Sequence, residues 1–170
     1  MPIEKRWVVK PQGNPKAVAA MAAATGISPV LANLLVQRGI DTVEKADKFF
    51  KPNLADLHDP FLMKDMDKAV ERVERAVRDH EKIMVYGDYD VDGCTAVALV
   101  YKFLRQIGHK NLMFYIPDRY TEGYGISVKG IDLAARKGVG LIIALDCGIK
   151  ATEKVVYAKT KGVDFIICDH

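Results

Sequence analysis

The sequence predicts an α/β fold in which a doubly wound, mainly parallel sheet carries helices on both faces. From residue 82 onward, short apolar runs alternate strictly with helix-like segments, as in parallel strands joined by crossover helices. One of these runs, residues 141–145, is wholly apolar, which is typical of a strand covered on both faces. Ahead of them, residues 65–80 place apolar side chains at helical spacing with charges on the opposite face, so this helix also packs on the core.

Turn and cap residues set the order of the remaining elements in this domain. Gly108, Gly138 and Gly162 stand just past helix-like segments, where a left-handed residue commonly ends a helix. We therefore expect helices over residues 95–107, 127–137 and 151–161. The strands between them are expected at residues 83–86, 112–116, 141–145 and 164–168.

A small helical region precedes the sheet. Asn14-Pro15 and Ser28-Pro29 are cap-plus-proline starts, and Asp41 or Thr42 caps a third helix that ends before Pro52. We expect this region to cover residues 1–62 and the α/β domain to cover residues 63–170. Because the chain stops directly after a strand, the α/β domain is expected to be truncated at its C-terminal end, as a fragment of a longer protein.

Composition excludes several classes of protein. The chain has 170 residues, 49% hydrophobic and 28% charged, which fits a globular domain rather than a disordered chain. No apolar run reaches the roughly 18 residues of a membrane span, and the N-terminus lacks a signal-peptide core, so no membrane partner is expected. Three cysteines without metal-site spacing suggest reduced thiols and a cytoplasmic location. A net charge of +3 permits a nucleic-acid partner without arguing for one.

Acidic residues follow three of the predicted strands directly. The carboxyl ends of parallel strands share one edge of a sheet, so these side chains should converge there. A single aspartate after a strand is often only a helix cap, but closely packed carboxylates need a neutralising charge, and oxygen and imidazole ligands suit Mn²⁺ or Mg²⁺. A pair of such ions would clamp a phosphoryl group and activate a water, so the pattern predicts phosphoester hydrolysis. The residues concerned are Asp88, Asp90, Asp92, Asp146, Asp169 and His170.

Two other interpretations of the aspartate stretch fit poorly. Asp88, Asp90 and Asp92 match the first half of a calcium-binding EF-hand loop, but Leu99 stands where that loop needs a bidentate glutamate. A haloacid-dehalogenase-type aspartyl nucleophile also follows a strand with an acid pair. In that interpretation Asp92 would occupy a position that requires threonine or valine.

The segment of residues 116–126 follows the second strand and so lies at the same edge. Arg119 can hold a phosphate, and Tyr120 or Tyr124 can stack on a base or sugar. Gly93 and Gly148, which follow the acids, would let backbone groups approach phosphate oxygens. The alternative is an ordinary loop with a turn at Gly123.

Four motifs in order resemble the DHH phosphoesterase superfamily, most closely its single-strand-specific exonucleases. They are GDYDVDG (87–93), PDRYTEGYG (117–125), LDCGI (145–149) and CDH (168–170), and ISPVLANLLVQRGIDT (27–42) and DPFLMKDMDKAV (59–70) extend the likeness. The resemblance implies a two-domain core with a Mn²⁺ or Mg²⁺ cluster, which in the complete protein holds two ions. It also implies degradation of single-stranded DNA from the 5′ end, in DNA repair and recombination.

The resemblance also implies roles for individual residues. Asp90, Asp92, Asp146 and His170 are expected as metal ligands, with Asp146 bridging. Asp88 and Asp169 are expected in the catalytic group, Asp88 as a hydrogen-bonding support, and whether Asp88 is a direct ligand stays open. Arg119, Tyr120, Tyr124 and Gly148 are expected to contact the substrate.

The signature of this superfamily continues with a second histidine, and further ligands lie beyond residue 170. We therefore expect the fragment itself to bind metal weakly and to be inactive. Two other functions stay open: a phosphodiesterase for oligonucleotides or cyclic dinucleotides, and a non-catalytic nucleic-acid-binding or interaction module. The sequence does not indicate protein partners.

Overall fold

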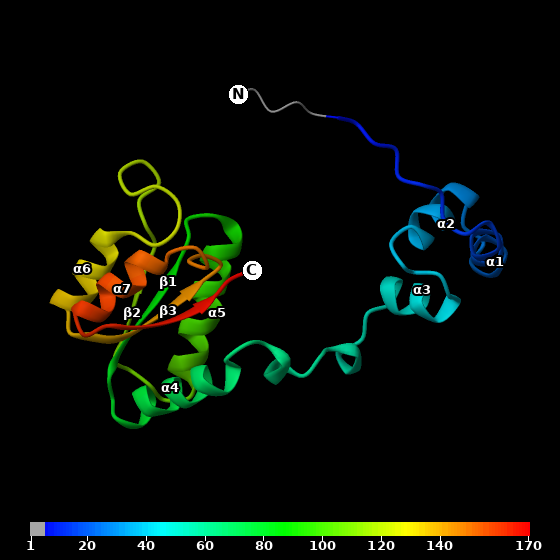
Figure 1. Ribbon diagram of the computed structural model, residues 1–170. Coiled ribbons are helices and arrows are strands. Elements are labelled where there is room, and N and C mark those ends of the chain that lie inside the picture. Colours follow the sequence, from blue (N-terminus) through cyan, green and yellow to red (C-terminus); the bar gives the residue numbers. More distant parts are fainter. Residues whose placement is uncertain (1–5) are drawn as a thin grey trace. The chain divides into compact units, whose positions relative to one another are not determined.

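The chain divides into two compact units, Met1–Pro60 and Phe61–His170, in a computed structural model that describes residues 6–170 (Figure 1). Each unit has its own hydrophobic core. The domain boundary predicted after residue 62 lies two residues from this division and stays a prediction.

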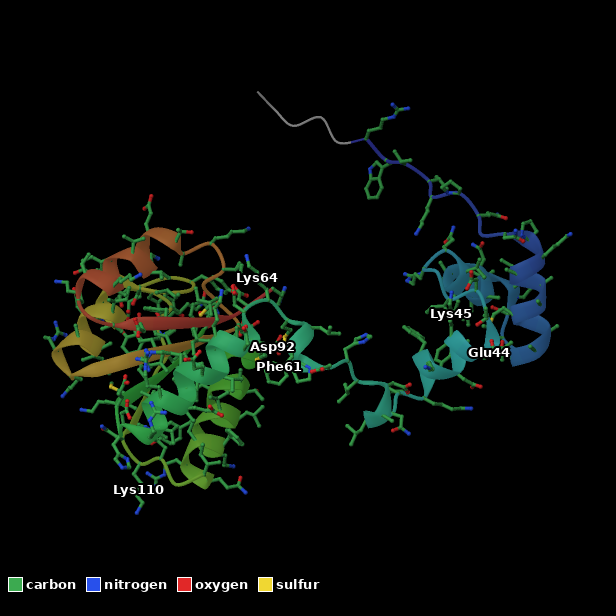
Figure 2. All side chains as sticks on the ribbon, turned by 60° about the horizontal axis from the view of Figure 1, so that its bottom comes forward. Glu44, Lys45, Phe61, Lys64, Asp92 and Lys110 are labelled. Atoms are coloured by element: carbon green, nitrogen blue, oxygen red, sulfur yellow. The ribbon has the colours of Figure 1, made fainter. Side chains whose placement is uncertain are left out.

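The first unit is helical, as predicted. It contains α1 (Pro15–Thr25), α2 (Pro29–Val36), α3 (Val43–Phe50) and the short 3-10 helix η1 (Leu54–Asp56), and a second 3-10 turn, η2 (Pro60–Leu62), follows at the boundary. The side chains of Asn14, Ser28 and Thr42 cap the three α-helices by accepting hydrogen bonds from backbone N–H groups. The core of the unit is small and consists of Met21, Ala32, Leu35 and Ala46. In Figure 2, Glu44 and Lys45 mark the start of α3.

The second unit is a parallel four-stranded sheet with the strand order β2-β1-β3-β4. The chain first moves from β1 to β2, then crosses back past β1 to β3 and continues to β4. This reversal confirms the predicted doubly wound α/β fold, and it places the switch point of the strand order between β1 and β3, where ligands bind in sheets of this kind. The elements are α4 (Met66–Arg78), β1 (Lys82–Gly87), α5 (Val91–Gln106), β2 (Leu112–Tyr115), α6 (Val128–Arg136), β3 (Val139–Leu145), α7 (Thr152–Thr160) and β4 (Asp164–Cys168).

Helices cover both faces of the sheet, because alternate side chains of each strand point to opposite sides (Figure 1). Met84 and Ile142 face α6 and α7, where they pack with Ile131 and Ala158. The neighbouring side chains of β1 and β3 face α4 and α5, and pack with Ala76, Val97 and Leu104. Both faces of β3, and of β1 from Ile83 onward, are therefore buried, which explains why these segments carry no charged residue.

One partly buried cation fastens α4 to the sheet. The guanidinium of Arg72, whose side chain is 14% exposed, donates to Glu81 at 2.7 Å and to Asp164 at 2.7 Å. It also donates to the carbonyl oxygen of Gly140 at 3.2 Å. Three acceptors from three places in the sequence therefore meet at one side chain of α4.

The helix predicted to begin at residue 95 begins four residues earlier, at Val91. The Asp90 side chain accepts a hydrogen bond from Gly93 N–H at 2.9 Å and so caps the helix. The acids and the glycine of residues 90–93 resemble a loop. Asp90 is nevertheless a strong helix cap, and Gly93 packs against the backbone of Asp88, where a side chain would not fit. The correction places Asp92 on the first turn of α5, where Figure 2 labels it.

Over residues 6–170, no helix has both the length and the apolar character needed to cross a membrane.

Candidate metal centre

Two glycines let α5 begin directly against the end of β1. A Cβ on Gly93 would lie 2.6 Å from the backbone nitrogen and oxygen of Asp88. A Cβ on Gly87 would lie 2.4 Å from a methyl group of Val97 and 2.8 Å from the Gly93 carbonyl oxygen. No side chain fits at either position, so the glycines bring Asp88 and the amino end of α5 together.

Asp88 is fully buried at this junction. Its Oδ1 accepts a hydrogen bond from Tyr89 N–H at 2.8 Å, while Oδ2 has no hydrogen-bond partner among the described residues. A buried carboxylate oxygen without a partner is costly, because the desolvated charge has nothing to offset it. Asp88 therefore favours a cation in its surroundings.

Asp146, Asp169 and His170 form a group that is suited to a metal ion. One ligand atom from each lies within 4.8 Å of the others, among the side chains that the structure describes. Asp146 directly follows β3, and Asp169 and His170 directly follow β4, so the parallel register places them at one edge as predicted. His170 Nε2 is 3.9 Å from Asp146 Oδ1, and its side chain is 97% exposed.

The backbone holds two of these carboxylates in place. Asp146 has a φ of 56°, in the left-handed region that non-glycine residues seldom adopt, and its N–H donates to the Cys168 carbonyl oxygen at 2.8 Å. Asp169 Oδ2 accepts from Ile149 N–H at 2.8 Å, and Oδ1 accepts from His170 N–H at 2.9 Å. Such an uncommon backbone conformation recurs at functional sites.

Negative charge gathers around Asp146. Burial, and then the charges of Asp90 and Asp92, raise the pKa of the Asp146 carboxyl above its usual range, against a smaller opposing effect of His170. Asp90 and Asp92 are thus close enough to act on Asp146 electrostatically, although neither belongs to the three-residue group. Asp90 is engaged as the helix cap, and Asp92 is exposed on the first turn of α5.

The loop before α6 reaches the acidic edge through aromatic side chains. The guanidinium carbon of Arg119 lies 5.3 Å from the ring centre of Tyr89, and the rings of Tyr89 and Tyr124 meet edge to face at 6.1 Å. Tyr124 Oη lies 3.5 Å from the Asp146 carbonyl oxygen. Tyr120, by contrast, is 93% exposed. Sequence reasoning missed Tyr89, although its place between two acids at the end of β1 was a usable signal.

Gly148 lines an open groove beside the metal group. Its φ of 111° suits glycine, and a Cβ there would lie 2.6 Å from the Ile126 side chain. The groove has a volume of about 800 Å³ and runs from Tyr124 past Gly148 to the start of α7. Asp169 and His170 border it, so a ligand in the groove would lie next to the predicted metal ligands.

The residues fit a divalent metal ion by their chemistry. Two carboxylates and an imidazole form a donor set suited to Mn²⁺ or Mg²⁺. Asp88, which follows the neighbouring strand β1, leaves a buried carboxylate oxygen without a hydrogen-bond partner among the described residues. Burial and the charges of Asp88 and Asp146 also raise the pKa of the Tyr124 hydroxyl, which shows that the negative field extends to the loop.

The fold and the acidic edge match a known class of protein. The profile described as "DHH family, N-terminal domain" matches residues 82–170, more than half of the chain. The chain therefore belongs to the DHH family.

Within this family the chain is similar to RecJ, the single-stranded-DNA-specific exonuclease. It is 41% identical to RecJ of Bacillus subtilis over 165 residues, which are 97% of this chain and 21% of that protein. It is 32% identical to RecJ of Escherichia coli over 145 residues, which are 85% of this chain and 24% of that protein. The chain thus spans between a fifth and a quarter of the length of these relatives.

Two solved structures share the fold. RecJ of Thermus thermophilus in complex with Mn²⁺ superposes with a TM-score of 0.66 at 26% identity, over 94% of this chain and 22% of that one. Another RecJ exonuclease bound to manganese gives a TM-score of 0.58 at 31% identity, over 64% of this chain and 28% of that one.

Proposed function

We propose that these residues belong to a metal-dependent exonuclease that degrades single-stranded DNA from its 5′ end, in DNA repair and recombination. The observation that carries the proposal is the meeting of Asp146, Asp169 and His170 within 4.8 Å at the carboxyl edge of the sheet. The named activity of the RecJ relatives and the manganese in two of their structures support it. A DNA substrate and reduced cysteines are consistent with a cytoplasmic location.

Each predicted site residue has a role in this proposal. Asp146 and His170 would hold a divalent ion together with Asp169, and Asp90 and Asp92 would be ligands of a second. Bound there, Mn²⁺ or Mg²⁺ would supply Lewis-acid activation of water and neutralise charge on the phosphoryl oxygens. Asp88, which is fully buried, is proposed as a hydrogen-bonding support for these ligands.

The loop and the groove are proposed to hold the DNA. Arg119 can pair with a phosphate in a fork of hydrogen bonds, and Tyr124 can stack on a base or sugar. The groove of about 800 Å³ is of a size that suits a nucleotide. Gly148 leaves the backbone open along its wall, and Tyr120 can reach the strand from the exposed loop.

The test is a degradation assay on single-stranded DNA labelled at one end, with Mn²⁺ or Mg²⁺ and with the whole protein. We expect mononucleotides to be released from the 5′ end and Asp146→Asn to slow the release at least about 100-fold. Asp79→Asn is the matched control, since Asp79 lies between α4 and the amino end of β1 and, among the described side chains, forms its ion pair with the neighbouring Arg78.

Either of two outcomes would contradict the proposal and favour another function. Cleavage of dinucleotides or cyclic dinucleotides without cleavage of long strands would favour a small-substrate phosphodiesterase of the same family. Unchanged function in Asp146→Asn and in Asp90→Ala would favour a non-catalytic binding module.

The 170-residue chain alone is expected to bind metal weakly and to hydrolyse DNA poorly or not at all. The reason is the small ligand set, since only three residues in the described part of the chain come together as potential ligands. Manganese-dependent degradation of single-stranded DNA by this chain, lost in Asp90→Ala, would show that expectation to be wrong.

A further inference from the structure

A second buried carboxylate lies outside the metal group and belongs to the loop before α6. The Glu122 side chain is 5% exposed. Its Oε2 accepts hydrogen bonds from Tyr115 Oη at 2.7 Å and Ser127 Oγ at 2.6 Å, and its Oε1 accepts from Asp118 N–H at 3.1 Å. Lys129 Nζ lies 3.5 Å from Oε1 on the solvent side.

The donors that reach Glu122 come from the scaffold on both sides of the loop. Tyr115 is the last residue of β2, and its ring stacks on Tyr86 at 5.3 Å. Ser127 caps α6 by accepting from Gly130 N–H at 2.9 Å. Tyr86 closes the connection, because its hydroxyl donates to the Gly125 carbonyl oxygen and accepts from Ser127 N–H, each at 2.9 Å.

The third donor carries the anchorage into the loop itself. Asp118, whose N–H binds Glu122, turns its own Oδ1 toward the loop and accepts from Tyr120 N–H at 3.0 Å and Thr121 N–H at 2.8 Å. Arg119 lies between Asp118 and these donors. Its guanidinium is therefore placed over the Tyr89 ring by a backbone that Glu122 and Asp118 hold.

We infer that Glu122 is a positioning residue that holds the loop of residues 117–125 so that Arg119 and Tyr124 face the metal group. Glu122 does not belong to the metal group of Asp146, Asp169 and His170 and does not line the groove. It acts through the hydrogen bonds that it accepts from Tyr115, Ser127 and Asp118. The inference rests on the proposed function, in which Arg119 and Tyr124 contact the DNA.

The site favours a carboxylate over an amide. The Asp118 N–H can only donate, and the hydroxyls of Tyr115 and Ser127 would have to turn round to accept from the N–H₂ of a glutamine. A glutamine would therefore replace charge-assisted hydrogen bonds by weaker neutral ones. Burial raises the pKa of Glu122, but the hydrogen bonds from Ser127, Tyr115 and the Asp118 N–H lower it by more, so the group is ionised at neutral pH.

The test compares Glu122→Gln with the wild-type 170-residue chain, with Glu74→Gln on the exposed face of α4 as the matched control. The first readout is the upfield NMR shift that the Tyr89 ring imposes on the Arg119 side-chain protons, which needs no substrate. The second is affinity for a dT oligonucleotide in the presence of Mn²⁺, and the third is the thermal midpoint.

We expect Glu122→Gln to lose the Arg119 shift and to weaken dT binding about tenfold, as for loss of a charge-assisted phosphate contact. Glu74→Gln should keep both. Tyr115→Phe removes only one donor, so it should reduce the shift partly and keeps the test decisive if Glu122→Gln does not fold.

An unchanged Arg119 shift in both Glu122→Gln and Tyr115→Phe would overturn the inference, whatever happens to the thermal midpoint. Loss of the shift in Glu122→Gln with unchanged dT affinity would also overturn it, since the loop position would then not serve binding. If no variant and not even the wild-type chain binds dT, the proposed DNA contact of Arg119 and Tyr124 fails. In that case the shift alone decides whether Glu122 holds the loop.

Discussion

Gly93 shows how one residue without a side chain shapes the centre. Its Cα faces the backbone of Asp88 so closely that an added Cβ would lie 2.6 Å from two backbone atoms. Those atoms cannot move aside without shifting β1. The conformation of Gly93 is helical, so space rather than a left-handed backbone requires glycine here.

Gly93→Ala should therefore destabilise the chain, although alanine is the better helix former. We expect a loss of about 3 kcal/mol in the free energy of unfolding, the upper part of the range for overpacking a tight site. Urea denaturation followed by circular dichroism measures it.

Gly108→Ala is the comparison for this experiment. Its φ of 92° strains alanine but the space around it is open, so a loss of about 1 kcal/mol is expected. A Gly93→Ala chain as stable as the wild type would contradict the close approach.

At the scale of elements, α4 shows how a surface helix is fixed to a sheet. Its apolar side, with Ala76 buried, packs on β1 and β3, and Arg72 adds directional contacts to Glu81, Asp164 and Gly140. Removing Arg72 would leave two carboxylates close together with little else to offset them. The amphipathic pattern predicted the helix and its packing, but it did not single out Arg72 among the charged residues.

We expect Arg72→Met to lower the free energy of unfolding by about 2 kcal/mol, since partly buried hydrogen-bonded charges lose their partner. Arg75→Met is the matched control. Arg75 is half exposed and lies 3.7 Å from Asp164, so its loss should cost less than about 0.5 kcal/mol. Equal effects in thermal melts of the two variants would mean that the Arg72 contacts add nothing beyond an ordinary surface pair.

Among the helix boundaries, the start of α5 differs most from the one predicted from the sequence. Residues 91–94 contain an acid and a glycine, which together resemble a loop, so the helix was predicted from residue 95. In the folded chain Asp90 caps the helix and Gly93 packs against Asp88, and both contacts depend on β1 lying alongside. Local propensity could not reveal them.

At the scale of the whole molecule, the potential metal ligands at the carboxyl edge should couple ion binding to folding. Asp146, Asp169 and His170 come from two strand ends and meet only in the native state, so an ion that they bind stabilises that state. At Mn²⁺ concentrations about tenfold above the dissociation constant, the gain is expected to be about 1.4 kcal/mol.

A rise of the thermal midpoint with Mn²⁺, reversed by chelator, would reveal this coupling in the 170-residue chain. Asp146→Asn should lose the rise, and Asp79→Asn should keep it. The same rise in Asp146→Asn would place the ion elsewhere.

The sequence by itself determined the class of fold and the edge that carries the candidate site. Alternation of strands and helices specified a parallel sheet, and acids directly after strands specified where they would meet, because register follows from strand direction. These features are local in the chain, or follow from general rules of connection, so the order of the residues alone predicts them.

Only the tertiary structure decided how the site residues divide their roles. It brought Asp146, Asp169 and His170 into one group, buried Asp88, and engaged Asp90 as a helix cap. It also showed Tyr89 beneath Arg119, and three hydrogen bonds that Glu122 accepts from Tyr115, Ser127 and Asp118. Each of these depends on distances between segments remote in sequence, which packing sets and residue order does not express.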